Sequence, residues 1–553
     1  MTKFFILLNL LTINVLIAQK TNVDLIVHNA HIYTVNEGFD EAEAFAVKDA
    51  KIIAVGASKD ILKKYNAAKI VDAGGKTILP GLIDAHAHFY GYGSTLQTVN
   101  LVGTKSWDDI LDKCQVFAKL HTEGWLIGRG WDQNDWDIKE YPTKEKLDAL
   151  FPKRPVILTR VDGHGAIANQ VALDLADVKV GQTLVGGEIV TKNDLLTGVL
   201  VDNAVGLVRS KIPQPTEKQN RQALLGAQKN CFAVGLTTVV DCGLDYKTVE
   251  LIEKMNAEKA LKMRLYVMLS DGRDNYAYLF KRGIIKTDRL NVRSFKLYAD
   301  GALGSRGACL LHPYADRANH FGFLLKDKTY YEAVMSKIAE HEGMQACTHA
   351  IGDSANREIL RIYGSILSRQ SGMKPEASSA SNDRRWRIEH AQVINEADFD
   401  LFKKYSIVPS VQPTHATSDM YWAGDRLGKE AEKGAYAFKR LLNQNGWLPL
   451  GTDFPVEDIN PILTFYAAVV RRDAKNYPEG GYLMENALSR EETLRGMTIW
   501  AAKANFEEKE KGSIEVGKFA DFIMLNQDIM TVAPTEILKT KVLTTYVGGE
   551  KVF

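Results

Sequence analysis

Eight short apolar runs of strand type recur along the middle of the chain, and segments with helical patterning separate most of them. The first run ends at His88, and the others are Gly235–Asp241, Leu265–Leu269, Ser294–Ala299, Gln345–His349, Trp386–His390, Ile407–Gln412 and Leu448–Asp453. Buried strands alternating with helices are typical of parallel βα architecture, and a TIM-type (β/α)8 barrel needs eight of them. We therefore predict an α/β fold with such a barrel over residues 80–507.

Both ends of the mature chain carry short strand-type runs separated by turns. Residues 22–79 contain several such runs and a Gly74-Gly75 turn, and residues 508–553 contain Phe522–Leu525 and Val542–Val547. Neither piece has enough strands to form a stable sandwich alone. Together they predict one composite β-sandwich domain, with the barrel inserted between its halves.

A long insertion follows barrel strand 1, at about residues 100–228. Loops of this length normally carry secondary structure of their own and often a function. We expect an inserted subdomain over the barrel mouth.

Residues 1–18 differ from the rest of the chain. Lys3 precedes the mostly apolar run Phe4–Ala18, which is shorter than the roughly 20 residues needed to span a bilayer. The pattern predicts a cleaved signal peptide, an exported (periplasmic or secreted) protein and no stable membrane insertion after cleavage. An uncleaved membrane anchor is the alternative.

Charge and cysteine content exclude some functions. The 553 residues include 69 basic and 68 acidic ones, for a net charge of +1, and no basic stripe indicates a nucleic-acid partner. The five cysteines are scattered, so we expect buried thiols and no disulfide framework.

Side chains able to bind a metal ion fall at the ends of five of the eight runs. His86 and His88 are spaced i, i+2 and so share one face of a strand. Lys296, His349, His390 and Asp453 lie in or end four further runs. Because barrel enzymes build their active sites at the carboxyl ends of the strands, we expect these residues to converge on a divalent ion such as Zn²⁺.

The motifs around these residues resemble the amidohydrolase superfamily of metal-dependent hydrolases. Within it, the chain is similar to the YtcJ-like branch that includes N-substituted formamide deformylase. The resemblance covers nearly the whole mature chain and lies in Pro80–His88, Asp162–His164, Phe295–Arg306, Thr348–Asp353, Arg387–Gln392 and Gly451–Val456.

The resemblance implies a role for each ligand. His86, His88 and Asp453 would hold the more buried of two Zn²⁺ ions, and His349 and His390 the more exposed one. Lys296, carboxylated by CO₂, would bridge the two ions, because a carbamate supplies the anionic oxygens that such ions accept. The alternative is a single ion, with Lys296 paired to Asp300 or to substrate.

The expected mechanism follows from the ions. Bound water has a pKa near roughly 7, so hydroxide would attack a polarised carbonyl carbon, with Asp453 as general base and then general acid. His164 is expected to stabilise the oxyanion, and His415 is a second candidate. Further candidate substrate contacts are Asp162, Trp131 and Arg306; Arg306 would bind a carboxylate or pair with Asp300 or Asp353.

These inferences favour hydrolysis of a non-peptide C–N bond in a small molecule: an amide, N-formyl, N-acyl or cyclic amide group. Deamination or C–O hydrolysis by one metal on the same fold is the alternative, and a non-catalytic binding protein is a more remote one. A homodimer is compatible with the sequence.

Overall fold

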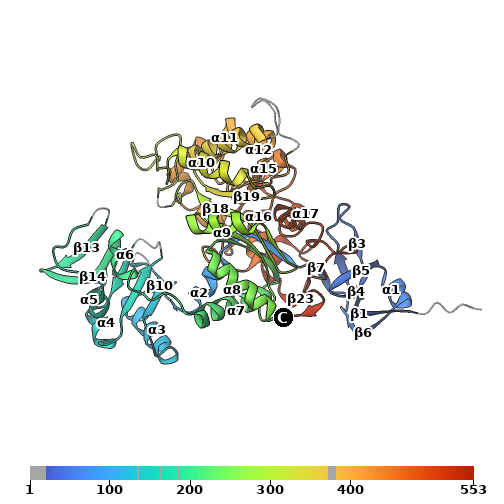
Figure 1. Ribbon diagram of the computed structural model, residues 1–553, viewed down its shortest axis with the longest axis horizontal. Coiled ribbons are helices and arrows are strands. Elements are labelled where there is room, and N and C mark those ends of the chain that lie inside the picture. The colour runs from blue at the N-terminus through green and yellow to red at the C-terminus, as the bar shows by residue number, and fades with distance from the viewer. Residues whose placement is uncertain (1–19, 134–135, 162–164, 185–186, 305, 371–381) are drawn as a thin grey trace, which may run out of the picture.

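The computed structural model describes residues 20–133, 136–161, 165–184, 187–304, 306–370 and 382–553. Three parts follow one another along its long axis (Figure 1): a small sheet domain to the left, a barrel in the centre and a β-domain to the right. The predicted signal peptide lies outside the described residues and stays a prediction. None of the helices in the described ranges is both long and apolar enough to cross a membrane.

The barrel is built from seven consecutive parallel strands that are almost entirely buried. In spatial order they are β8 (Leu82–Ala87), β15 (Leu236–Leu244), β16 (Arg264–Ser270), β18 (Leu290–Tyr298), β19 (Gln345–Ala350), β20 (Arg387–His390) and β21 (Val408–Ser410). A short strand, β17 (Ile285–Lys286), pairs antiparallel with β18. The strand-type runs of the sequence thus form the expected parallel sheet.

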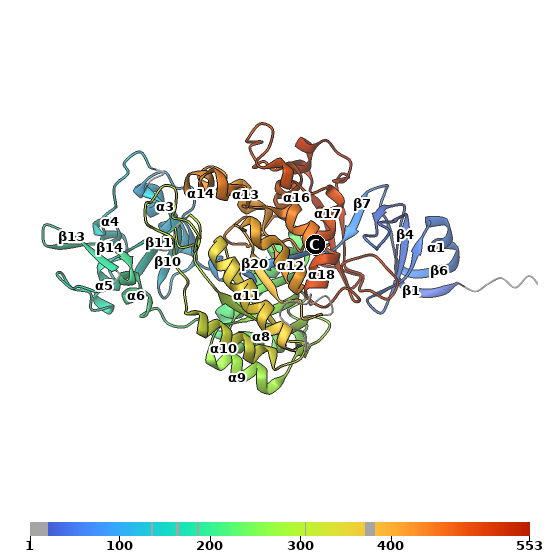
Figure 2. The same ribbon diagram turned by 90° about the horizontal axis from the view of Figure 1, so that it is seen from above.

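Helices connect the strands and cover the barrel on the outside (Figure 2). They are α7 (Glu217–Ala233), α8 (Tyr246–Ala257), α9 (Arg273–Arg282), α10 (Lys328–Ala339), α11 (Asp353–Gln370), α12 (Phe399–Tyr405), α15 (Phe438–Asn445) and α16 (Pro461–Val470). Three further helices follow the carboxyl ends of β8 and β21: α2 (Phe89–Thr95), α13 (Pro413–Asp419) and α14 (Ala423–Glu432).

The eighth predicted strand, Leu448–Asp453, closes the barrel without forming a regular strand. Leu450 makes a single parallel bridge to Val411, the residue that directly follows β21. On its other side, the Leu450 carbonyl accepts from the Ala85 amide at 3.1 Å, and the Asp453 amide donates to His86 at 2.7 Å. A Cβ at position 451 would lie 2.5 Å from the backbone nitrogen of His86. Glycine therefore lets this segment approach β8 closely enough to place Asp453 beside His86.

The capping box Ser489/Glu492 opens α17 (Arg490–Gly496) as the sequence predicts, but the helix does not run on to Asn505. It breaks at Met497 and Thr498, and α18 (Ile499–Ala504) follows. The Met497 carbonyl accepts from the Ile83 amide of β8 at 2.8 Å. The break therefore turns a helical carbonyl toward the barrel wall.

Strands from both ends of the chain share one sheet of the β-domain. Its order is β24 (Glu550–Lys551), β23 (Val542–Val547), β22 (Phe522–Leu525), β7 (Thr77–Pro80), β2 (His31–Tyr33) and β3 (Glu41–Ala42), with β22 antiparallel to β7. A second sheet consists of β5 (Lys51–Gly56), β4 (Ala44–Lys48), β1 (Thr21–His28) and β6 (Tyr65–Asp72), and α1 (Ser58–Lys64) packs on it. Phe45 and Ile78, from different sheets, belong to one buried core with Phe522. This is the composite sandwich that the two terminal segments predict.

The insertion after β8 has its own sheet and its own core. The sheet order is β13 (Gly187–Lys192), β14 (Leu195–Asp202), β12 (Gly165–Ala168), β11 (Val156–Arg160), β10 (Leu126–Trp131) and β9 (Val99–Asn100). Around it lie α3 (Trp107–Leu120), α4 (Glu145–Leu150), α5 (Gln170–Leu175) and α6 (Asn203–Arg209). The next helix, α7, packs against α2 and β15 and so belongs with the barrel.

Candidate metal centre

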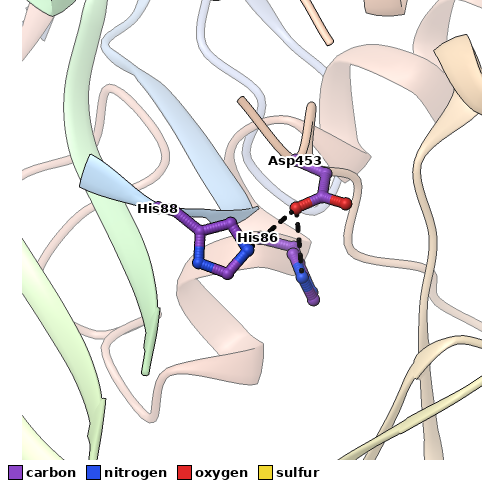
Figure 3. Close-up of side chains that lie close together, drawn as sticks. All are labelled: His86, His88 and Asp453. Carbon is purple, nitrogen blue, oxygen red and sulfur yellow. Dashed lines mark ion pairs between the residues drawn. The ribbon is translucent and has the colours of Figure 1, made fainter. Parts of the chain in front are cut away.

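The first three predicted ligands converge at one end of the barrel. His86 lies near the end of β8, His88 directly follows that strand, and Asp453 lies on the irregular eighth segment. The three side chains point toward one another (Figure 3). Asp453 Oδ1 lies 3.6 Å from His86 Nε2 and 3.2 Å from His88 Nε2. His86 and Asp453 are buried, whereas the His88 side chain is 30% exposed.

A second group shares Asp453 with the first. One ligand atom from each of His390, His415 and Asp453 lies within 4.8 Å of the others. His390 ends β20, and His415 lies in α13, which begins directly after β21. His415 Nε2 is 3.2 Å from Asp453 Oδ2.

The other two predicted ligands, Lys296 and His349, line the same cavity. Lys296 Nζ on β18 lies 3.3 Å from His86 Nε2. The ring of His349 on β19 is 4.5 Å from that of His390, measured between centroids. His349 Nε2 has no hydrogen-bond partner in the described part of the chain and lies 3.6 Å from Asp300 Oδ1.

Buried carboxylates behind the ligands hold them in place. Glu389 Oε2 lies 2.5 Å from His86 Nδ1, and both side chains are fully buried. Asp84 accepts from the His86 amide at 3.1 Å and from the amide and hydroxyl of Thr452 at 3.0 and 2.7 Å. It thereby ties β8 to the segment that carries Asp453. No role for Glu389 is predicted from the sequence, although a charged residue inside an otherwise apolar barrel strand needs a buried partner.

Burial keeps three of the imidazoles neutral, which is the form that binds metal ions. Removal from water, reinforced by the charge of Lys296, lowers the pKa of His349 to about 3 and also lowers the pKa of His86. Burial also holds the pKa of His390 well below its ordinary value. All three are therefore ready to act as ligands at neutral pH.

Asp453 and His415 form an ionised pair. Burial disfavours the Asp453 carboxylate, but the attraction of His86, the hydrogen bond with His415 and the nearby ring of His88 hold its pKa well below the ordinary value. Burial likewise disfavours the His415 cation, yet its contacts with Asp453 and Glu457 hold its pKa well above the ordinary value.

The donor set fits a divalent ion. Three buried ligand atoms lack hydrogen-bond partners in the described part of the chain: His349 Nε2, His390 Nδ1 and Asp453 Oδ1. Buried polar groups rarely stay unpaired, and an ion bound between them would satisfy them. Imidazole and carboxylate donors suit zinc and similar metals.

The ligands open into a cavity of about 510 Å³. Its wall combines apolar residues, among them Leu303, Ile351 and Trp422, with the carboxylates of Asp419 and Glu457. A cavity of this size and mixed lining suits a small organic molecule.

The predicted substrate contacts have different positions. Asp162 and His164 lie outside the described residues, so their roles stay predictions. His415 lines the cavity. Arg306 forms an ion pair with Asp316, at 2.7 Å, and not with the expected Asp300 or Asp353.

Trp131 lies in the core of the insertion and not on the described wall of the cavity. It is completely buried, and its indole nitrogen donates to the Leu158 carbonyl at 2.8 Å.

The fold and the convergent donors define a metal-dependent hydrolase of the amidohydrolase type. Residues 69–553 match the Amidohydro_3 model, described as "Amidohydrolase family", so the chain belongs to this family and is a hydrolase. The resemblance drawn from the motifs is confirmed.

Relatives and solved structures agree with the family. The chain is 32% identical to "Protein LONG AFTER FAR-RED 3" of Arabidopsis thaliana, over 96% of this chain and 91% of that protein. It is 30% identical to "Putative amidohydrolase YtcJ" of Bacillus subtilis (95% and 98% covered) and 26% identical to "N-substituted formamide deformylase" of Arthrobacter pascens (95% and 97% covered). A crystal structure of an "uncharacterized metal-dependent hydrolase" from Pyrococcus furiosus aligns with a TM-score of 0.76 at 26% identity, over 92% of this chain and all of that one.

Proposed function

We propose that this hydrolase cleaves a non-peptide C–N bond in a small molecule, of the amide, N-formyl, N-acyl or cyclic amide type. The observation that carries the proposal is the buried, ionised Asp453, which faces two imidazoles at the bottom of a cavity and has one unpartnered oxygen. Such a group can accept and return a proton beside a metal-activated water. The relative named as an N-substituted formamide deformylase supports the bond type.

His86, His88 and Asp453 would hold the first ion, which we propose to be Zn²⁺. When bound, the ion supplies a Lewis acid for the substrate carbonyl and a water of lowered pKa. Glu389 fixes the ring of His86, because a carboxylate on Nδ1 leaves Nε2 free for the ion.

Asp453 carries the proton in this mechanism. Its carboxylate takes a proton from the water that attacks the carbonyl carbon and gives it to the leaving nitrogen. The substrate would lie in the cavity against the apolar wall that includes Trp422 and Ile351.

Lys296 is proposed to carry a carbamate that bridges to a second Zn²⁺. Burial disfavours its charge, but Cys242, Tyr298, Glu389 and Asp453 hold the pKa of its ammonium above the ordinary value. A carbamate forms only from the neutral amine, so Lys296 would have to lose its proton before it reacts with CO₂. Native mass spectrometry of the metal-loaded chain would show the added mass of one CO₂; loading without that mass contradicts the carbamate.

Replacing Asp453 by Asn tests the proposed chemistry. We expect kcat to fall by about 10²–10⁴-fold because proton transfer is lost, while most of the metal stays on the histidines. Amine release from a panel of N-formyl and N-acyl amides measures activity, and elemental analysis measures metal. Asp458→Asn, the same change at an exposed neighbour, is the control. Full activity in Asp453→Asn contradicts the assignment, and release of ammonia or an alcohol instead of an amine indicates deamination or C–O hydrolysis.

A further inference from the structure

We propose that Asp419 is a specificity-determining residue, which selects substrates that carry a positively charged group a few bonds away from the scissile C–N bond. The inference rests on the proposed hydrolytic function and names the class of amide that the site takes: N-formyl or N-acyl derivatives of diamines with one amine free. N-acyl amino acids, which carry a carboxylate at the corresponding place, would be poor substrates.

The cavity wall is acidic outside the set of predicted metal ligands. Asp419 and Glu457 both line it. Among the described lining residues, the one lysine or arginine is Lys296, which belongs to the ligand set. Carboxylates in a partly apolar cavity attract cations and repel anions more strongly than they do in water. The described wall therefore favours a cationic substrate over an anionic one.

Asp419 differs from Glu457 in the charge of its partners. Glu457 Oε1 lies 2.9 Å from Nδ1 of His415, which its two carboxylate neighbours hold as a cation. Asp419 accepts instead from two neutral groups, the Tyr436 hydroxyl at 2.8 Å and the Gln392 amide at 3.3 Å. Both bonds go to Oδ2. The Glu457 charge is thus paired within the wall, whereas Asp419 forms no ion pair with a lysine or arginine of the described residues.

The electrostatic environment of Asp419 agrees with an unbalanced charge. Burial raises the pKa of its carboxyl group, and neither the attraction of His415 nor the bond from Tyr436 reverses this shift. A raised pKa means that the surroundings stabilise the carboxylate less well than water does. A substrate ammonium group beside Asp419 would supply the missing positive charge.

The position of Asp419 in α13 indicates where the charge of the substrate would lie. His415, whose Nε2 is 3.2 Å from Asp453, is four residues before Asp419 in the same helix. Residues spaced i, i+4 lie on one face of a helix, with their Cβ atoms about 5–6 Å apart. A cation at Asp419 would therefore lie about one helical turn from the proposed proton carrier, a span of a few methylene groups.

The apolar part of the wall suits those methylene groups. Trp422 follows Asp419 by three residues, and Leu303 and Ile351 line the same cavity. Hydrocarbon that packs against these side chains leaves water, which favours binding. The indole of Trp422 also attracts cations, as the Arg426 guanidinium 5.6 Å from its ring centroid shows.

Two arginines represent the opposite possibility, a site for a substrate carboxylate. Arg306 and Arg426 both pair with Asp316. Neither of them is among the residues that line the described cavity. Their charges are thus engaged by Asp316, outside the wall on which Asp419 lies.

Three compounds of equal length test the inference: N-formylputrescine, which is cationic, N-formylpentylamine, which is neutral, and formamidopentanoate, which is anionic. Their N-acetyl counterparts are assayed in parallel, and release of formate or acetate gives kcat/KM. For the wild type we expect a preference of about 10–100-fold for the cation over the neutral compound, the usual gain from a hydrogen bond between charged groups. The anion should be the poorest substrate.

Asp419→Asn removes the charge and keeps the shape of the side chain and an oxygen that accepts from Tyr436. The preference for the cation over the neutral compound should fall to near unity, mainly through a higher KM for the cation. A merely structural role for Asp419 would lower kcat/KM for all three compounds and preserve their ratio. Calorimetric binding of the same compounds to Asp453→Asn, with and without Asp419→Asn, gives the comparison without turnover.

Two control variants carry the same type of change. Glu457→Gln should retain the preference for the cation, because His415 already pairs with the Glu457 charge. Asp425→Asn, at an exposed position in α14, should match the wild type. Circular dichroism confirms that each variant is folded.

The outcomes separate this inference from the proposed function. A wild type that prefers the anion, or that treats the three compounds alike, overturns the inference and leaves amide hydrolysis intact. A cation preference that survives in Asp419→Asn overturns it as well. Failure of the metal-loaded wild type to hydrolyse any of the compounds counts against the proposed function, and the binding ratios then decide the inference by themselves.

Discussion

At the scale of residues, ionisable groups at the carboxyl end of the barrel form pairs of an imidazole and a carboxylate that holds it in place. His86 is supported by Glu389 and His415 by Glu457, while Asp453 stands between the two rings. Each carboxylate reaches its histidine from a different strand or loop. The protonation of each ring therefore depends on the folded barrel and not on its own sequence neighbours.

His349 gives a pH-dependent test of this environment. Its pKa is about 3 in the folded chain and about 6.5 in an unfolded one, so below pH 6.5 the unfolded state binds the proton more strongly. The buried, neutral His349 therefore makes the free energy of unfolding fall progressively as the pH drops from about 6.5 toward 3. In metal-free protein, we compare the melting temperatures of the wild type and His349→Gln at pH 7.5 and at pH 5. Lowering the pH should reduce the melting temperature of the wild type by more than that of the variant. Parallel melting curves for the two proteins would contradict the shifted pKa.

Single residues also show how far the sequence predicts this site. His86, His88, Lys296, His349, His390 and Asp453 are recognisable because each lies at or near the end of an apolar run. The contact between His415 and Glu457 is not recognisable from the sequence. The two residues are 42 positions apart, and their contact depends on the path of the chain at the carboxyl end of the barrel. Asp162 and His164 are recognisable as a motif, but their roles stay predictions.

At the scale of elements, strands that consist of an apolar run can be predicted from the sequence. Segments whose conformation depends on a few tertiary backbone hydrogen bonds cannot. Runs such as Gln345–His349 match β19 nearly residue for residue. The pattern of Leu448–Asp453 predicts a strand. Its backbone hydrogen bonds go to Val411, after β21, and to β8, but they do not form the regular ladder of a strand. The break between α17 and α18 has the same origin, since a tertiary bond to Ile83 outweighs helix propensity.

A buried ion pair joins the barrel to the β-domain and should be sensitive to truncation. Arg264, at the start of β16, bonds Asp521 at 2.6 and 3.0 Å, and both side chains are at most 4% exposed. Arg264→Ala leaves a buried carboxylate without its partner, so we expect a loss of about 3–5 kcal/mol in the free energy of unfolding. Urea titration followed by circular dichroism measures it.

The control is the surface pair of Arg221 and Glu258, with side chains 24% and 42% exposed. Arg221→Ala should cost about 0–1 kcal/mol, because water screens the pair. Equal losses in Arg264→Ala and Arg221→Ala would show that the buried pair has no special role in holding the two domains together.

At the scale of the whole molecule, the insertion and the β-domain lie at opposite ends of the barrel (Figure 2). The β-domain is tied to the barrel by chain that enters and leaves it and by the Arg264–Asp521 pair. The insertion encloses separate buried clusters of its own, one of them around Leu158 and Trp131. Its stability should therefore be separable from that of the metal site.

Two variants with matched core positions test this separation. Leu158 on β11 and Leu265 on β16 are both buried, but in the cores of the insertion and the barrel respectively. Four of the eight tryptophans, at 107, 125, 131 and 136, report on the insertion by fluorescence. Release of bound Zn²⁺ during a urea titration reports on the barrel. Each Leu→Ala change should cost about 2–5 kcal/mol in its own core.

Leu158→Ala should shift the fluorescence transition to lower urea and leave zinc release in place, because the cavity it creates lies away from the ligands. Leu265→Ala should shift zinc release instead, since β16 is part of the barrel wall. If both probes move together in both variants, the chain unfolds as one cooperative unit, and the insertion contributes to the stability of the metal site in spite of its separate core.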